Sequence, residues 1–262
     1  MTNELNADEN AIRALISAGS EMAGGAGAGA LGYYVGGAGG AAIGGATGPL
    51  LMRWLRGAAG EVVHRVLGER EKARVGATLG MAAQKIQENL NNGQQVRQDG
   101  FFEDRPGERA AGKEILEGVL LVAQREYQEK KLRFHANLLA NIAFHQEIDR
   151  AQANLLIRVG EQISYRQMCL IALFANEGGH IGLREQKYEG ANVSLGTAAV
   201  LHEVCDLCVR LLLVCSREAV MIPAWVNPSK MKVQGTGAML YNLMELWRVD
   251  PVDVAEVAGL LR

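Results

Sequence analysis

The sequence predicts a mainly α-helical protein, with an N-terminal glycine-zipper membrane helix, a helical bundle and a winged-helix-like C-terminal unit. Three observations predict this fold class. Residues 22–52 contain no charged side chain and are mostly glycine and alanine. Residues 108–161 repeat apolar side chains at the spacing of helices. Residues 162–262 place helical patterns around two short apolar segments, which is the outline of a hairpin between helices.

The N-terminal tail, residues 1–21, is acidic and polar. Its residues 7–18 fit a short amphipathic helix, which is too short to be stable alone. A secretory signal would be basic at this position, so no cleavable signal is expected.

Residues 22–52 form the glycine zipper, named for small residues that recur at every fourth position: Gly32, Gly36, Gly40, Gly44 and Gly48. In water each interior glycine destabilises a helix by roughly 0.8–1 kcal/mol relative to alanine. In lipid an unpaired backbone is costlier still, and small residues four apart let two helices approach closely. The uncharged run exceeds the roughly 20 residues that span a bilayer. We therefore expect a transmembrane helix that associates into a homo-oligomer in the lipid bilayer.

Two other interpretations of the zipper stay open, a flexible glycine-rich linker between domains and a tightly packed soluble helix. For a spanning helix, the flanking charges set the orientation. Acidic residues dominate residues 1–21, whereas Arg53, Arg56 and Arg65 follow the zipper. Because basic flanks stay on the cytoplasmic side, the large C-terminal body is expected in the cytoplasm. The linker interpretation makes the whole chain cytoplasmic.

Residues 53–90 are expected to form amphipathic helices. Arg53, Trp54 and Arg56 stand at their start, and a tryptophan between basic residues is typical of an interfacial membrane anchor. The alternative is an ordinary surface helix on a soluble core. Residues 91–107 then collect glycine, proline and polar side chains, which predicts a linker at a domain boundary.

Residues 108–161 predict a helical domain. The apolar pattern favours one unbroken helix over 108–144, with Tyr127 on its apolar stripe, and a second helix over 149–161. The charged side chains in the middle of the first helix are expected to form a solvated face.

Residues 162–262 predict the winged-helix-like unit. Ser164 is the expected cap of its first helix. The expected elements are helices at 165–176 and 194–207, apolar segments at 210–215 and 231–233, and helices at 238–247 and 251–261.

The motifs argue against an enzyme and against a bound cofactor. Gly27, Gly29 and Gly32 match the spacing of a dinucleotide fingerprint, but no apolar strand precedes them. The carboxylates of residues 108–161 lie on charged helical faces without a partner histidine or nucleophile. We therefore expect no catalytic residues and no cofactor.

The four cysteines, Cys169, Cys205, Cys208 and Cys215, are too few for a disulfide framework and indicate a reducing compartment. Cys205 and Cys208 lie near His202 at a spacing that a zinc site or a redox pair would allow. They also lie in an apolar run, which favours buried thiols. We therefore expect no metal site.

Arg217, Lys230 and Lys232, with Arg210 nearby, are the candidate nucleic-acid contacts of the winged-helix-like unit. Four cations without an aromatic stacking set make a small footprint, and the net charge of −2 adds no overall attraction. Winged-helix-like units also serve as protein-contact modules. Binding of nucleic acid is therefore an alternative, not the leading expectation.

Three segments between residues 126 and 247 carry a family resemblance: Glu129–His145 with its Leu-Leu-Ala-Asn run, Ile163–Leu173, and Val233–Tyr241. They resemble, in this order, a charged helix that leads into such a run, the next helix, and the start of the last segment in the Abi-alpha abortive-infection proteins. The resemblance implies defence of a bacterial cell against phage by halting the infected cell. It implies no catalytic residues.

These observations together predict a membrane-associated anti-phage effector of the bacterial inner membrane. Its zipper would oligomerise and permeabilise that membrane, and its cytoplasmic body would respond to a phage-derived or defence-system protein as trigger. Two alternatives stay open, a soluble winged-helix regulator that binds nucleic acid and a non-catalytic scaffold, each with the glycine-rich segment as a linker.

Overall fold

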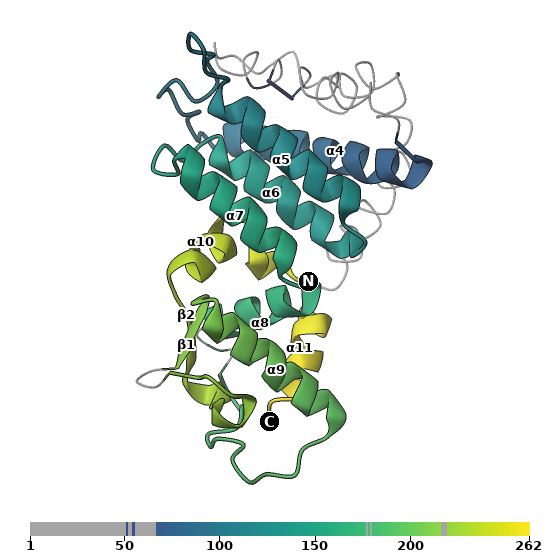
Figure 1. Cartoon of the computed structure of the whole chain (residues 1–262), viewed down its shortest axis with the longest axis vertical. Coiled ribbons are helices and arrows are strands. Elements are labelled where there is room, and N and C mark those ends of the chain that lie inside the picture. The colour runs from purple at the N-terminus through teal and green to yellow at the C-terminus, as the bar shows by residue number, and fades with distance from the viewer. Residues whose placement is uncertain (1–50, 52–53, 56–66, 177, 179, 216–218) are drawn as a thin grey trace. The chain divides into compact units, whose positions relative to one another are not determined.

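The computed structural model of the chain describes residues 51, 54–55, 67–176, 178, 180–215 and 219–262. The protein is mainly α-helical, and eight α-helices and one two-stranded sheet lie wholly within these residues (Figure 1). The chain divides into two compact units, unit 1 up to Glu161 and unit 2 from Gln162. The N-terminal tail, the zipper glycines, Arg53, Arg56 and Arg217 lie outside the described residues. Within the described residues, no helix is both long enough and apolar enough to span a bilayer.

Unit 1 contains four described helices: α4 (Glu69–Asn91), α5 (Ala111–Arg125), α6 (Leu132–Ile142) and α7 (Arg150–Gln162). Helix α4 packs against both α5 and α6. Helix α7 lies along α5, where Asn154 donates to Glu114 at 2.5 Å. The core between them is built from fully buried aliphatic side chains, among them Ile86, Ile115, Leu120 and Leu138.

The expected unbroken helix over 108–144 is wrong, because the chain turns between α5 and α6. The turn is fixed by a buried ion pair in which Nζ of Lys131 lies 2.6 Å from Oε2 of Glu126. The other carboxylate oxygen of Glu126 accepts the backbone N–H of Gln128 at 2.9 Å, which closes the turn on itself. Tyr127, expected on the apolar stripe, is 82% exposed at this turn.

The stretch 91–107 is part of unit 1 instead of a linker between domains. Val96 and Phe101 of this loop are buried, and the backbone N–H of Arg97 donates to the carbonyl of Ala143 at 3.1 Å. Its glycines do mark turns, since Gly93, Gly100 and Gly107 have φ values near +78° (78°, 79° and 77°). The polar composition was therefore a correct signal for a loop, while the buried apolar side chains attach that loop to the helices.

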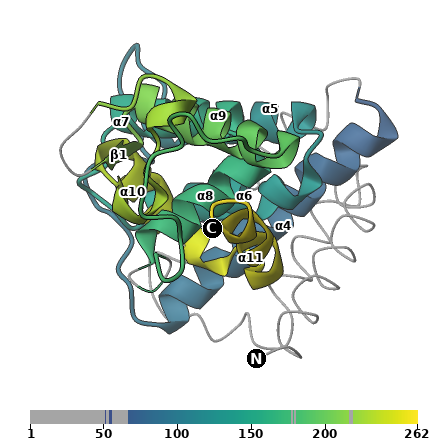
Figure 2. The same cartoon turned by 90° about the horizontal axis from the view of Figure 1, so that it is seen from below.

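Unit 2 contains α8 (Tyr165–Ala175), α9 (Leu195–Val209), β1 (Leu213–Cys215), β2 (Met231–Val233), α10 (Gly235–Leu243) and α11 (Pro251–Gly259). The two strands pair antiparallel, with Leu213 opposite Val233. Helix α8 is the centre of the unit and packs against α9, α10, α11 and β2. Figures 1 and 2 both show α11 beside α8.

The expected starts of two helices in unit 2 are confirmed at the level of single hydrogen bonds. Ser164 caps α8 by accepting the backbone N–H of Gln167, whose side chain returns a bond to the backbone N–H of Ser164. Ser194 caps α9 by accepting the backbone N–H of Thr197 at 3.0 Å, without a returned bond to its own backbone N–H. Helix α10 ends before the expected Trp247, because Glu245 adopts a left-handed conformation with φ 56°.

Unit 2 depends on a close approach between β1 and the start of α10. A Cβ atom added at Gly237 would lie 2.3 Å from the carbonyl oxygen of Leu212. The same carbonyl accepts the backbone N–H of Gln234 at 3.1 Å, so it has no freedom to move aside. Only glycine fits position 237.

We expect Gly237→Ala to destabilise unit 2 by about 1–3 kcal/mol through this overlap. The matched control is Gly259→Ala at the end of α11, where an added Cβ meets nothing within 4 Å. Urea unfolding followed by tryptophan emission, in a chain with Trp54→Phe, measures both. Equal stability of the two variants would contradict the close approach.

Candidate functional site

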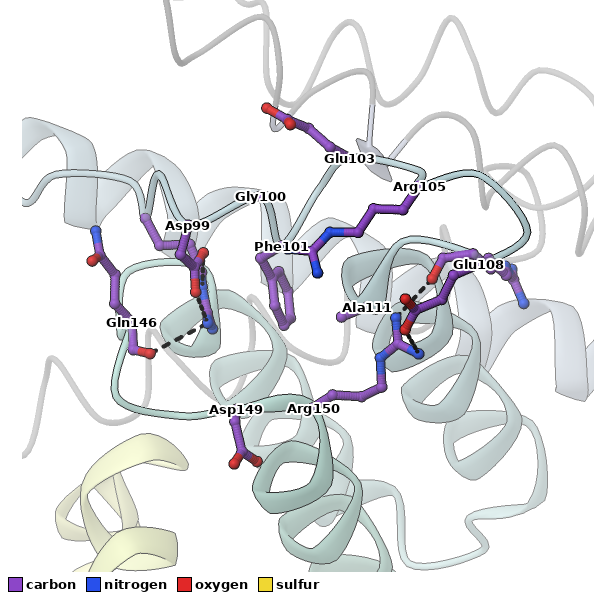
Figure 3. A pocket seen from close by; sticks show the side chains of 12 residues that line it. Asp99, Gly100, Phe101, Glu103, Arg105, Glu108, Ala111, Gln146, Asp149 and Arg150 are labelled. Atoms are coloured by element: carbon purple, nitrogen blue, oxygen red, sulfur yellow. Dashed lines mark hydrogen bonds and ion pairs between the residues drawn. The ribbon is translucent and has the colours of Figure 1, made fainter.

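A pocket of about 290 Å³ lies in unit 1, between the α4–α5 loop and the turn that joins α6 to α7. Figure 3 shows side chains of both segments around it. Its lining residues are mostly charged: Arg97, Asp99, Gly100, Phe101, Glu103, Arg105, Glu108, Arg109, Ala111, Gln146, Asp149 and Arg150. The wall contains four arginines and four carboxylates, so its chemistry depends on which of them are already paired.

Arg97 forms the floor of the pocket and uses all five of its N–H donors. Its Nε and one Nη bind the two carboxylate oxygens of Asp99 at 3.0 and 2.6 Å. The remaining donors bind backbone carbonyls of the α6–α7 turn: those of Ile142, Gln146 and Ile148. The side chain is 2% exposed. Hydrogen bonds from Arg97 also hold the pKa of Asp99 below its usual value.

Arg150 fixes the opposite wall. It lies 2.9 Å from a carboxylate oxygen of Glu108 and donates to the backbone carbonyl of Arg109 at 2.7 Å. Glu108 in turn pairs with Arg105 through two backbone hydrogen bonds, of 3.0 and 2.9 Å, across a tight turn that contains Gly107. Arg109 pairs with Glu117 on α5. The start of α7 is thereby joined to the loop that precedes α5.

Arg105 differs from the other three arginines of the pocket. Among the residues that the structure describes, its side chain has no hydrogen-bonding or ionic partner, and it is exposed. Its guanidinium reaches across the pocket toward Phe101 in Figure 3, and its Nη2 lies 3.4 Å from the position of an added Cβ at Gly100. The pocket therefore contains one guanidinium, that of Arg105, without a partner among the described residues, and it is directed toward the ring of Phe101.

Three aromatic rings connect the pocket to the end of the zipper, and we call them the aromatic row: Phe101, Phe102 and Trp54. The guanidinium of Arg97 lies over the ring of Phe101, with Cζ of Arg97 3.9 Å from the ring centroid. Phe101 and Phe102 meet edge to face with centroids 5.2 Å apart, and Phe102 meets Trp54 at 5.1 Å. Such pairs each contribute roughly 0.5–1.5 kcal/mol beyond the area they bury.

Gly112 on α5 makes the Trp54 contact possible. An added Cβ there would lie 2.9 Å from the ring of Phe102 and 3.2 Å from Nε1 of Trp54. Trp54 is 8% exposed, and its indole N–H is buried without an acceptor among the described residues. A buried donor without an acceptor costs about 1–3 kcal/mol, which offsets part of the gain from burying the ring.

The structure places Trp54 in the wall of unit 1. Leu51 and Leu55, its neighbours in the sequence, are completely buried. In this conformation the ring is not at the surface, where an interfacial anchor has to lie, so the anchor role stays a prediction for another conformation. Sequence reasoning missed Phe101 and Phe102, although two adjacent aromatic residues inside a polar loop were a usable signal.

A second polar cluster in unit 1 consists of Glu126, Lys131 and His135. His135 is completely buried, its Nε2 lies 3.8 Å from Oε2 of Glu126, and neither ring nitrogen has a hydrogen bond among the described residues. Burial lowers the pKa of His135. Burial also opposes ionisation of Glu126, but its interactions with His135, Lys131 and the Gln128 backbone outweigh this and lower its pKa to about 2. The side chains of Lys131 and Glu126 are only 3% and 5% exposed, so the cluster is nearly closed to solvent.

The candidate nucleic-acid residues differ in how exposed and how engaged their side chains are. Lys230, directly before β2, and Lys232, within β2, are both exposed. Arg210 is ion-paired with Asp206 at 2.8 Å and donates to Gln162. Arg217 lies outside the described residues.

The cysteines of unit 2 are all free thiols, and all are buried. Burial, with the neighbouring Cys205 and Cys215, raises the pKa of Cys208 to about 12, which keeps this thiol protonated and makes it a poor metal ligand. His202 is exposed. In the described part of the chain, no three ligand side chains gather in an arrangement that would hold a metal ion.

Comparison of the chain with family models, with curated proteins and with solved structures finds no match. The Abi-alpha resemblance therefore stays a prediction.

We expect Arg97→Met to destabilise unit 1 by about 1–3 kcal/mol, because the carbonyls of the buried residues Ile142 and Ile148 lose their Arg97 donor. Arg97→Lys is expected to be partly destabilising, since an ammonium cannot supply five donors in a planar fork. The control is Arg158→Met on α7, an exposed arginine without a partner among the described residues, which should change stability by about 0.5 kcal/mol or less. Urea unfolding of the full-length variants measures their free energies of unfolding and so ranks the three substitutions.

His135 gives unit 1 a predicted dependence on pH. Its pKa is lowered by folding, so the unfolded chain takes up the proton more readily, and stability should fall as the pH drops below the ordinary value of 6.5. The slope is expected to approach about 1.4 kcal/mol per pH unit for one proton. His135→Leu should remove this slope between pH 6.5 and 5, before Glu126 titrates, whereas His202→Gln should keep it. Urea unfolding at several pH values measures the slopes, and parallel profiles for all three chains would contradict this role.

Proposed function

We propose that the protein is a membrane-associated effector of anti-phage defence, whose zipper oligomerises in the bacterial inner membrane and permeabilises it. The observation that carries the proposal is the zipper itself, 31 uncharged residues with Gly32, Gly36, Gly40, Gly44 and Gly48 at a spacing of four. The basic residues after it favour a cytoplasmic position for units 1 and 2.

The burial of Trp54 supports a role for unit 1 in controlling the zipper. The zipper ends at residue 52, and three residues around this end, Leu51, Trp54 and Leu55, are buried. Any change in unit 1 that releases Trp54 also changes where the zipper ends. A tryptophan released beside Arg53 and Arg56 has the composition of an interfacial anchor.

A protein trigger fits the exposed surface of unit 2. Helix α9 is followed by the β1–β2 pair and then α10, an order that supports the winged-helix-like interpretation. Between and before the strands, several large apolar side chains are exposed: Leu211, Met221, Ile222 and Trp225. Exposed apolar side chains of this size favour contact with protein over contact with the charged backbone of nucleic acid.

The decisive test replaces zipper glycines. In full-length chains, Gly36→Leu with Gly40→Leu is expected to abolish homo-oligomers in the membrane fraction and toxicity to the cell, because the added side chains separate the helices. Ala42→Leu is the matched control, since it adds a leucine of the same size on the opposite face of the helix. Unchanged toxicity and fractionation in the double variant would refute the zipper mechanism.

The second candidate is a soluble regulator that binds nucleic acid, favoured by the two exposed lysines at β2, Lys230 and Lys232. It predicts a full-length chain in the soluble fraction, with salt-dependent DNA binding that is lost in Lys230→Glu/Lys232→Glu. Electrophoretic mobility shifts at two salt concentrations, beside membrane fractionation, separate the two candidates.

A further inference from the structure

The pocket of unit 1 holds one cationic group that the fold does not use. Arg97, Arg109 and Arg150 are each engaged by carboxylates or backbone carbonyls. Arg105 has no partner among the described residues, although it lines the same cavity. The Arg105 side chain is exposed, and in Figure 3 its guanidinium reaches toward Phe101.

None of the carboxylates of the wall forms an ion pair with Arg105 among the described residues. Asp99 is bound by Arg97 and Glu108 by Arg150. Asp149 accepts the backbone N–H of Gln152 and so caps the start of α7. Figure 3 shows the side chains of Glu103 and Asp149 directed away from the centre of the pocket. Arg105 is therefore the arginine of this wall that has no ion pair among the described residues, and Glu103, whose Oε2 lies 3.9 Å from the position of an added Cβ at Gly100, is the carboxylate with which a bound anion would compete.

We propose that this pocket binds a small ligand through a phosphate or carboxylate group held by Arg105, and that binding alters the contact between Phe102 and Trp54. The planar guanidinium offers paired donors that match the oxygens of either group. The ring of Phe101 supplies an apolar wall beside that group. A cavity of about 290 Å³ is at the lower end of the range for ligand pockets, so the ligand is a small molecule and not a protein segment.

The aromatic row carries the effect of binding to Trp54. Phe101 lines the pocket and touches Phe102, which touches Trp54, with centroid distances of 5.2 and 5.1 Å. Both rings also pack closely on Gly112, where an added Cβ would lie 2.9 Å from Phe102 and 3.2 Å from Trp54. A ligand held by Arg105 beside Phe101 would press on the Phe101 ring, and through these two ring contacts a displacement of Phe101 would change the surroundings of Trp54.

This inference does not rest on the proposed membrane function, because binding and the response of Trp54 can be measured in the purified protein. The chain has two other tryptophans, Trp225 and Trp247. A full-length chain with both changed to phenylalanine reports on Trp54 alone. It is purified in a mild detergent and titrated at constant ionic strength with inorganic phosphate and, separately, with citrate.

We expect saturable binding of at least one probe, and the probe that binds tells phosphate from carboxylate recognition. Arg105→Gln should weaken binding by about tenfold or more, because a charged hydrogen-bonding partner is lost. Arg105→Lys should weaken it less, and Arg158→Gln, which removes an exposed arginine outside the pocket, should not change it. No saturable binding of either probe, or equal affinity in Arg105→Gln and the parent, would overturn the site.

The coupling is tested in the same titration by the emission of Trp54. Saturation with the bound probe is expected to shift the emission maximum, since the surroundings of the indole change. Phe102→Leu should keep the affinity within about threefold, because Phe102 does not line the pocket, and should abolish the shift. An emission that does not respond, or that responds equally in Phe102→Leu, would overturn the coupling.

Discussion

The five hydrogen bonds of Arg97 are the interaction on which unit 1 depends most. They join a loop of mainly polar composition to the carbonyls of the α6–α7 turn and to Asp99. A buried arginine is stable only when all its donors are satisfied, so the loop has essentially one conformation that keeps this side chain buried. That conformation sets Phe101 under the guanidinium and Phe102 against Trp54. The pocket and the burial of Trp54 both follow from it.

The other buried charges of unit 1 act in the same way at the turn between α5 and α6. Glu126 and Lys131 compensate each other, and Lys131 also donates to the backbone carbonyl of Glu161 at the end of α7. Arg74 of α4 donates to the carbonyl of Glu126 at 2.7 Å. Three helices thereby meet at one turn, which explains why a side chain as costly to bury as Lys131 is 3% exposed.

Local patterns in the sequence predicted the helices of unit 2 well, and long-range contacts in unit 1 poorly. The cap at Ser164 and the start of the helix at residue 194 were predicted because a cap and the helix it starts are neighbours in the chain. The turn at Glu126 was not, because the charged stretch around it fits a solvated helical face equally well, and only contacts with α4 and α7 select the turn. Of the candidate site, the residues after the zipper were singled out, including Trp54. The pocket was not predicted, since Arg97, Arg105 and Arg150 are far apart in sequence and resemble ordinary surface arginines.

The absence of a side chain at Gly112 has a consequence for how this fold can change. Both Phe102 and Trp54 fit against α5 only because position 112 is bare, so even one methyl group there would separate the two rings. A homologue with a different residue in place of Trp54 could keep the pocket unchanged. It would then also need a different fit at residue 112 and Phe102. Substitutions at position 112, at Phe102 and at Trp54 are therefore expected to depend on one another.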